Sequence, residues 1–389
     1  MNGVCSIFSQ VLGVFSRAEF EQAVRDHKAE HHARGFNSWT QMVAMLFCHL
    51  GKAQSLREIC GGLAACEGKL RHLGVVQSPK RSTLAYANEH RPWELYQTVF
   101  GGLLEKCQRE VRGGKKFRFK NKLLSLDGSV IDLSATMYDW AKFRQTKGGV
   151  KLHLLLDHDG YLPKYAVIEP ASVAELKVAR GLSFEPGTIV VFDRGYTDYK
   201  WFASLTKQGV YFVTRQRWNS YRKLVKELPV PEKGNILADQ IVKLGHRGYR
   251  TGVPVRRVVV RDPETGKKFE FLTNKMDFAA STIAKIYRDR WQIETFFKAL
   301  KQSLRVKTFV GTSANALKTQ IWTALIAMLI LKYLQLKSSF GWSLSNLVAL
   351  LRQQLFVYRD LWTWLDCPFE PPPALAGIHD QLPLPLQIS

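Results

Sequence analysis

Hydrophobic residues recur at helical spacing between Ile283 and Val310, and this stretch anchors our interpretation of the rest of the chain. Apolar side chains three and four positions apart lie on one face of an α-helix, so the pattern predicts a single long amphipathic helix here. The residues of the predicted apolar face are Ile286, Ile293, Phe296, Phe297 and Leu300.

The polar side of this predicted helix combines aromatic, basic and acidic groups. At ~100° per residue, Arg290, Glu294 and Lys301 fall within roughly 60° of Tyr287 around the helix axis. Lys298 adds a second ammonium group to the same surroundings. Such a surface suits the binding of phosphates around one metal-binding acid.

Residues 1–115 are predicted to form a separate helical domain, in which glycines interrupt the helical stretches. Several short helices with a basic turn, Ser-Pro-Lys-Arg-Ser at residues 78–82, favour a helix-turn-helix-like DNA reader, so this domain is a candidate DNA-binding region. The alternative is a helical bundle that only packs against the rest of the protein. The predicted helices are Phe20–His31, Trp39–Leu50, Ser55–Leu63, Ser82–Glu89 and Pro92–Arg109.

Strands and helices alternate between residues 120 and 215. Asp159-Gly160 predicts a hairpin, and Ser172 with Glu175 predicts a capping box at the start of a helix. Three strands, helix, strand, helix, strand is the order of a ribonuclease-H-like α/β core. The predicted elements are strands Lys122–Leu133, Gly149–Leu156 and Pro163–Ile168, helix Ser172–Leu182, strand Thr188–Phe192, helix Asp198–Gln208 and strand Gly209–Thr214.

A β-rich insertion is predicted in residues 216–276, where β-branched residues alternate with polar ones between Gly and Pro turns. The catalytic core would then comprise residues 120–215 and 277–312, on either side of this insertion. C-terminal helices are predicted in residues 313–366. The proline-rich tail, residues 367–389, is predicted to be irregular or disordered.

The net charge of the chain indicates what kind of partner the protein binds. The 389 residues include 56 Lys and Arg against 33 Asp and Glu, a net charge of +23. This excess favours a polyanion as partner, nucleic acid before a membrane surface, with a generically basic soluble protein as the alternative.

Six scattered cysteines indicate thiols of a reducing cytosol. The most apolar run, residues 321–331, is well short of the ~20 residues that span a bilayer, so we expect a buried helix and a cytoplasmic protein without membrane contact.

Three acids could hold metal ions. Asp127 lies within a predicted apolar strand and Asp193 directly after another, where an unpaired carboxylate would cost several kcal/mol. Glu294 adds a third oxygen donor from the helix, whereas Asp289 is predicted to point away. Oxygen ligands favour Mg²⁺, with Mn²⁺ able to substitute, and two such ions can promote in-line phosphodiester chemistry. Each acid also has a structural interpretation: a turn, a salt-bridged loop or a solvated helix charge.

Tyr287, Arg290, Glu294 and Lys301 match the spacing Y-(2)-R-(3)-E-(6)-K. This signature, with Asp-Arg-Gly-Tyr at 193–196 and Phe-Leu-Thr-Asn at 271–274, resembles the insertion-sequence-4 family of bacterial DDE transposases. The resemblance implies a ribonuclease-H-like core with a β-insertion and a metal-holding triad of Asp127, Asp193 and Glu294.

The same resemblance implies that Tyr287, Arg290 and Lys301 contact double-stranded transposon-end DNA, and that Lys298 lies among them. It further implies a homodimer that cuts DNA at the element's ends and joins 3′-OH ends to target DNA, in the bacterial cytoplasm at the nucleoid. Trp291 could stack on an extruded base; packing between helix and sheet is the alternative. A DNA-binding regulator without turnover, or a ribonuclease-H-like nuclease, are the alternative functions.

Overall fold

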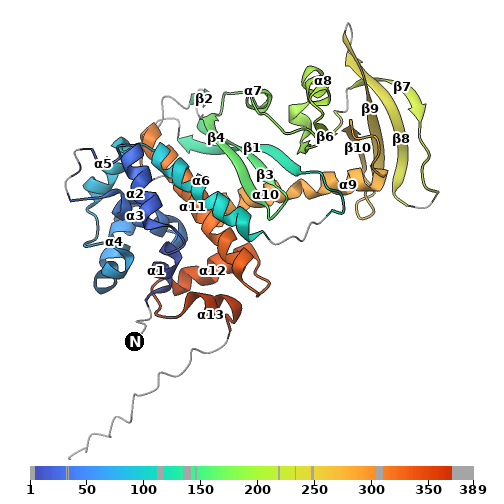
Figure 1. Ribbon diagram of the computed structural model, residues 1–389. Coiled ribbons are helices and arrows are strands. Elements are labelled where there is room, and N and C mark those ends of the chain that lie inside the picture. The colour runs from blue at the N-terminus through green and yellow to red at the C-terminus, as the bar shows by residue number, and fades with distance from the viewer. Residues whose placement is uncertain are drawn as a thin grey trace, which may run out of the picture.

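The computed structural model describes residues 5–31, 33, 35–111, 117–134, 142–144, 147–217, 220–232, 234–246, 249–303 and 310–369. A helical part, built from both ends of the described chain, lies beside a part dominated by one large sheet (Figure 1). The predicted mixed α/β class is therefore confirmed. Residues 304–309 of the predicted long helix, and residues 370–389 of the predicted tail, lie outside the described residues.

Helices from the two ends of the chain share one hydrophobic core, so the predicted separation of the N-terminal helices is not seen in their packing. The C-terminal helix α11 packs against α3, α5 and α6, and its Trp322 stacks on Trp93 with ring centroids 6.3 Å apart. The helices are α1 (Ile7–Leu12), α2 (Arg17–Asp26), α3 (Ser38–Leu50), α4 (Leu56–Ala64), α5 (Arg81–His90), α6 (Glu94–Glu110), α11 (Ala314–Lys337), α12 (Leu344–Gln354) and α13 (Leu361–Asp366), with a 3₁₀ turn, η1, at Glu67–Leu73.

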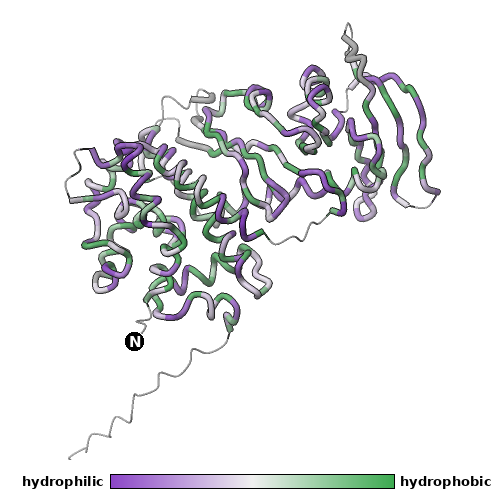
Figure 2. The backbone as a smooth tube through the Cα atoms, in the orientation of Figure 1, coloured by the Kyte–Doolittle hydropathy of each residue, from purple (hydrophilic) through white to green (hydrophobic). Residues whose placement is uncertain are grey.

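Helix α11 lies at the centre of this helical part. A helix that is apolar on all sides needs a buried position, and hydrophobic residues follow α11 and its neighbours (Figure 2). Within the described part of the chain it is the one helix whose length and composition would allow it to cross a membrane, and 83% of its apolar window is buried inside the protein. The predicted buried helix is thus confirmed.

The sheet has ten strands in the order β2-β3-β1-β5-β6-β10-β9-β8-β7, with β4 paired to β3. Strands β1, β5 and β6 run parallel, and the other pairs are antiparallel. The strands are β1 (Leu123–Ser134), β2 (Lys142–Arg144), β3 (Lys147–Asp157), β4 (Leu162–Pro170), β5 (Ile189–Phe192), β6 (Tyr211–Arg215), β7 (Tyr221–Glu227), β8 (Ile236–His246), β9 (Tyr249–Arg261) and β10 (Lys268–Thr273).

The β-rich segment extends this sheet. Strand β10 pairs with β6, so the strands predicted as an insertion continue the central sheet without a break in hydrogen bonding. Strand β7, at the outer edge, lies within the segment predicted to be β-rich; all its residues are exposed and its sequence mixes charged with apolar positions. The domain boundaries themselves stay a prediction.

Helices cover both faces of the central strands. Alternate residues of β1 point to opposite faces: Leu124 and Leu126 pack with α8 (Tyr199–Lys207), whereas Leu123 packs with α9 (Ala280–Asp289). Helix α10 (Trp291–Lys298) continues from α9 and contacts β1, and a π-helical turn spans Ala299–Ser303.

Two local predictions were wrong. The long helix is divided at Arg290, where Arg290 N bonds to the Tyr287 carbonyl and the Arg290 carbonyl accepts from Ile293 N. These three-residue spacings replace the regular four-residue ladder and separate α9 from α10. The predicted capping box is absent as well, because helix α7 begins only at Glu175 (Glu175–Arg180) and has no side-chain cap.

Candidate active site

Two neighbouring parallel strands place Asp127 and Asp193 together. Leu126 of β1 is in register with Phe192 of β5, so the next residue of each strand is an aspartate at the same level of the sheet. Each carboxylate is oriented by a backbone N–H: Asp127 Oδ1 accepts from Gly128 at 2.8 Å and Asp193 Oδ1 from Gly195 at 2.6 Å. The two predicted acids thus lie at one edge of the site.

Arg290 contacts both Asp127 and Glu294. Its Nη1 lies 3.3 Å from Oδ2 of Asp127, and its Nη2 donates to Oε1 of Glu294 one helical turn further on. Helix α10 therefore presents Glu294 on the same side of the sheet as Asp127. Arg290 is linked to both acids through a planar, bidentate guanidinium, a geometry that lysine cannot reproduce.

Burial dominates the ionisation of Asp127. Removal from water raises the pKa of its carboxyl to about 7, against the lowering effects of Arg290 and of the Gly128 N–H. The negative charges of Asp193 and Glu175 add to the rise. Burial therefore disfavours the ionised form of Asp127, and additional positive charge nearby would stabilise that form.

The donor set suits a hard divalent cation. Asp127, Asp193 and Glu294 supply only carboxylate oxygens, and the place between Asp127 and Glu294 already accommodates the positive charge of Arg290. Within the described residues, however, no three His, Cys, Asp or Glu side chains are arranged closely enough to hold an ion. An ion shared by these acids would lie beside the positive charge of Arg290.

Tyr287 and Trp291 border the acids differently. The Tyr287 ring packs on Phe271, with centroids 4.8 Å apart, and under the Arg290 guanidinium at 5.5 Å; burial raises its pKa. Trp291 is 63% exposed, so the alternative of helix–sheet packing was wrong for this side chain. Both residues line a cavity of about 340 Å³ that Phe269 and Phe271 also border.

The two lysines of the helix take different positions. Lys301 Nζ donates to the Val130 carbonyl of β1 at 2.5 Å, three residues beyond Asp127, and so links the π-helical turn to the central strand. Lys298 is exposed to solvent at the end of α10. Their expected contacts with DNA stay predictions.

Sequence reasoning missed a fourth carboxylate at this site. Glu175 pairs with Lys151 of β3 at 3.2 Å, and a Cβ atom built at Gly128 or at Gly195 would lie 3.4 Å from one of its oxygens. The Glu175 carboxylate thus lies beside the glycines that follow the two aspartates. The Tyr196 hydroxyl is buried nearby and has no hydrogen-bond partner among the described residues; burial raises its pKa, with further rises from Glu175 and both aspartates.

Asp289 turned out to be structural. As predicted it does not join the acids around Arg290; it is buried and accepts from His158 Nδ1 at 2.6 Å. His158 Nε2 lies 2.7 Å from Ser125 Oγ, and the Tyr161 hydroxyl donates to Asp289 at 3.2 Å. This network links the end of α9 to β1. Ser125 lies on that strand two residues before Asp127.

Comparison with known families identifies the class. Residues 118–330, which contain all three acids, match the transposase DDE domain, and residues 5–76 match a domain of unknown function. The chain belongs to the DDE transposase family. Transposase DDE domains use divalent metal ions, in agreement with the oxygen-rich site.

Named relatives agree with this assignment. A protein of Sinorhizobium fredii, y4zB, named as a transposase, is 30% identical over 310 residues, 78% of this chain and 85% of its own length. A Geobacillus stearothermophilus protein named as the transposase for insertion sequence element IS5377 is 29% identical, covering 68% and 70% of the two chains. A piggyBac transposase synaptic complex with hairpin DNA aligns over 94% of this chain and 82% of its own with 11% identity and a TM-score of 0.44.

Proposed function

We propose that this transposase binds the ends of an insertion sequence, cleaves the DNA there and joins the 3′-OH ends to target DNA. We further propose that it belongs to the insertion-sequence-4 branch, with strands β1 to β6 and helices α7 to α10 as a ribonuclease-H-like core. The observation that carries the proposal is the meeting of Asp127 with Glu294 through Arg290, beside an aspartate in register on the next strand.

Asp127, Asp193 and Glu294 would hold two Mg²⁺ ions, and Mn²⁺ would substitute. When bound, such ions activate a nucleophilic oxygen and neutralise charge on the phosphodiester. The protein's own contribution is to orient the carboxylates through the Gly128 and Gly195 N–H groups and to keep Asp127 largely away from water.

The DNA end would lie along α9 and α10. Arg290 suits bidentate contact with a phosphate, and its guanidinium lies over the ring of Tyr287. Lys298 and Lys301 would contribute charge further along. Trp291, exposed beside an aromatic-lined cavity of about 340 Å³, would stack on an extruded base. We propose a homodimer as the working form, acting at the nucleoid of a bacterial cell, with the N-terminal helices as a further DNA contact.

The test replaces each acid in turn. Asp127→Ala, Asp193→Ala and Glu294→Ala should each abolish Mg²⁺-dependent cleavage of a duplex that carries the element's end, while duplex binding persists. Glu185→Gln, which changes an exposed acid in the loop after α7, is the matched control and should cleave normally. Undiminished cleavage by any one alanine variant would remove that residue from the proposed triad.

The two alternative functions predict different products. A regulator without turnover would bind the end but leave it intact in either metal. A nuclease would cut it but fail to join a pre-cut end with a 3′-OH to a second duplex. Joined product from the pre-cut end is the outcome that supports the transposase.

A further inference from the structure

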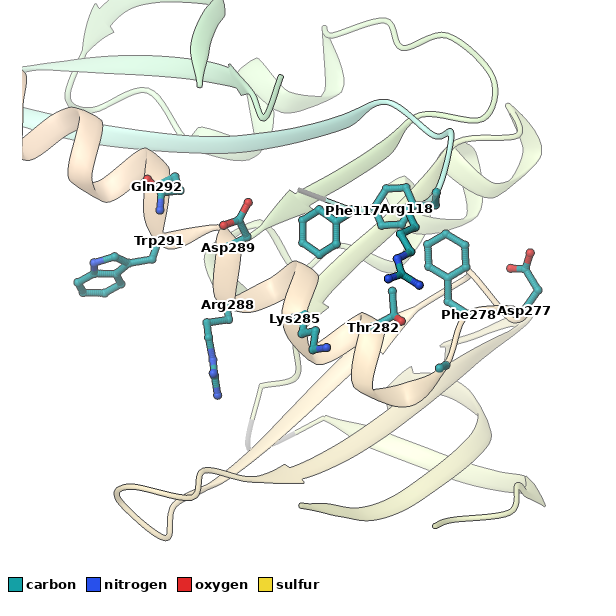
Figure 3. Close-up of a pocket in the computed structure, with 12 residues that line it drawn as sticks. Phe117, Arg118, Asp277, Phe278, Thr282, Lys285, Arg288, Asp289, Trp291 and Gln292 are labelled. Carbon is teal, nitrogen blue, oxygen red and sulfur yellow. The ribbon is translucent and has the colours of Figure 1, made fainter. Parts of the chain in front are cut away.

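A groove of about 920 Å³ runs beside α9, on the side of the helix that carries Thr282, Lys285 and Asp289. Trp291 and Gln292 lie at one end of it, directly after Arg290, and Asp277 lies at the other end (Figure 3). Arg288 and Trp291 also line the cavity of about 340 Å³ that Tyr287 and Arg290 border, so the groove adjoins that cavity.

Aromatic rings from two chain segments line the groove. Phe117 stacks on Phe119 with centroids 5.1 Å apart, and Phe119 packs on Phe278 at 4.9 Å. All three rings are only partly buried, so the groove keeps an aromatic surface within reach of solvent. Such a surface suits unpaired bases, because each base offers a flat face for stacking.

Cations lie along the same groove. The guanidinium of Arg118 and the ammonium of Lys285 extend toward Thr282 in the cavity (Figure 3). Within the part of the chain that the structure describes, neither group has a hydrogen bond or an ion pair. Arg288 is exposed one turn beyond Lys285.

The two acids of the groove do not offset this charge. Asp277 is paired with Lys275 at 3.1 Å, and Asp289 is held by His158 at 2.6 Å. Positive groups of the groove therefore face solvent beside aromatic rings, whereas its carboxylates are engaged within the protein.

We propose that this groove binds a single, unpaired DNA strand as it leaves the active site. Arg118 and Lys285 would contact phosphates, and bases would stack against Phe117, Phe119 and Phe278. A duplex fits less well, because its bases already stack on one another and offer no face to the rings. The inference rests on the proposed function, which supplies the DNA strand.

Binding of fluorescein-labelled oligonucleotides tests the groove without any cleavage step. The full-length double variant Arg118→Gln/Lys285→Gln is compared with Lys177→Gln/Lys207→Gln, which removes the same charge from exposed positions on α7 and α8 across the sheet. A 20-nucleotide oligothymidine and a 20-base-pair duplex are titrated in EDTA at several salt concentrations. Photocrosslinking of a 5-iodouracil oligonucleotide then locates the bases.

For the single strand, the groove variant should lower the slope of log K against log salt by about 1.4, since each lost phosphate contact removes ~0.7. The control variant should keep the slope, the duplex should change less, and crosslinks should fall on peptides with Phe117, Phe119 or Phe278. Equal single-strand binding by the two variants would overturn the proposal, and so would an equal loss for strand and duplex. Absence of cleavage by the wild-type protein would instead count against the proposed function, because the binding comparison does not need it.

Discussion

Arg290 Nη1 lies 3.3 Å from Asp127 Oδ2 while its other nitrogen donates to Glu294, so one guanidinium occupies two of the three proposed metal ligands. A metal ion held by these carboxylates would therefore lie close to the positive charge of this guanidinium, which would oppose its binding. Arg290→Gln should raise the affinity of the DNA-free protein for Mn²⁺ about fivefold, as expected for ~1 kcal/mol between charges near 4 Å in water, yet lower DNA cleavage. Calorimetric titration with Mn²⁺ measures the affinity.

Arg222→Gln serves as the control for this change, because Arg222 lies on the exposed strand β7. It should leave Mn²⁺ affinity unchanged. If Arg290→Gln also leaves the affinity unchanged, the charge of Arg290 does not oppose binding of the ion.

Metal binding should depend on pH through Asp127. Its pKa is raised to about 7 in the metal-free protein, and a metal ion binds only the carboxylate form. Below about pH 7 a proton therefore competes, and Mn²⁺ affinity should fall by up to tenfold per pH unit. Titrations between pH 5.5 and 8.5 (chosen to span roughly 1.5 units either side) measure this dependence, which should flatten at the alkaline end. A flat profile throughout would show that Asp127 is ionised at all these pH values.

Replacing Lys298 should weaken DNA binding alone, whereas replacing Lys301 should lower both DNA binding and thermal stability. Lys298→Ala should lower the salt slope for duplex binding by ~0.9 and leave Tm unchanged, because its side chain is exposed. Lys301→Ala should weaken DNA binding and lower Tm too, since it also loses the bond to the Val130 carbonyl. A hydrogen bond from a charged group is worth roughly 1.5–3 kcal/mol. Equal melting temperatures for the two variants would contradict the tether to β1.

The buried pair of His158 and Asp289 should stabilise the junction beneath the acids. Both side chains are nearly inaccessible, with 5% and 2% of their surface exposed, and breaking a buried pair costs about 3 kcal/mol or more. Asp289→Ala and His158→Ala should each lower the free energy of unfolding in urea by that amount. Their effects should be far from additive in the double variant, because one change already breaks the pair.

Glu185→Gln again supplies the control, as an exposed acid whose loss should change the free energy of unfolding little. Additive losses from Asp289→Ala and His158→Ala would mean that the two side chains do not act as a pair.

Local patterns predicted much of the sheet and of the helices around it. Apolar runs around Asp127 and before Asp193 specify strands whatever lies beside them, and the observed β1 and β5 follow them closely. The predicted capping box does not form. Instead, Glu175 pairs with Lys151, which lies on a strand that a local sequence rule does not consider. The β-rich character of the segment that contains β7 was predicted, but the exposed pattern of β7 does not show where the strand pairs in the sheet.

The sequence by itself determined the order of the strands and helices, the basic character of the chain and the presence of Asp127, Asp193 and Glu294 in suitable elements. Only the tertiary structure decided that Arg290 joins two of these acids, that Glu175 lies beside them and that the ends of the chain share a core. The physical reason is range: periodicity reflects which face of one element is buried, whereas these contacts depend on the packing of elements far apart in the chain.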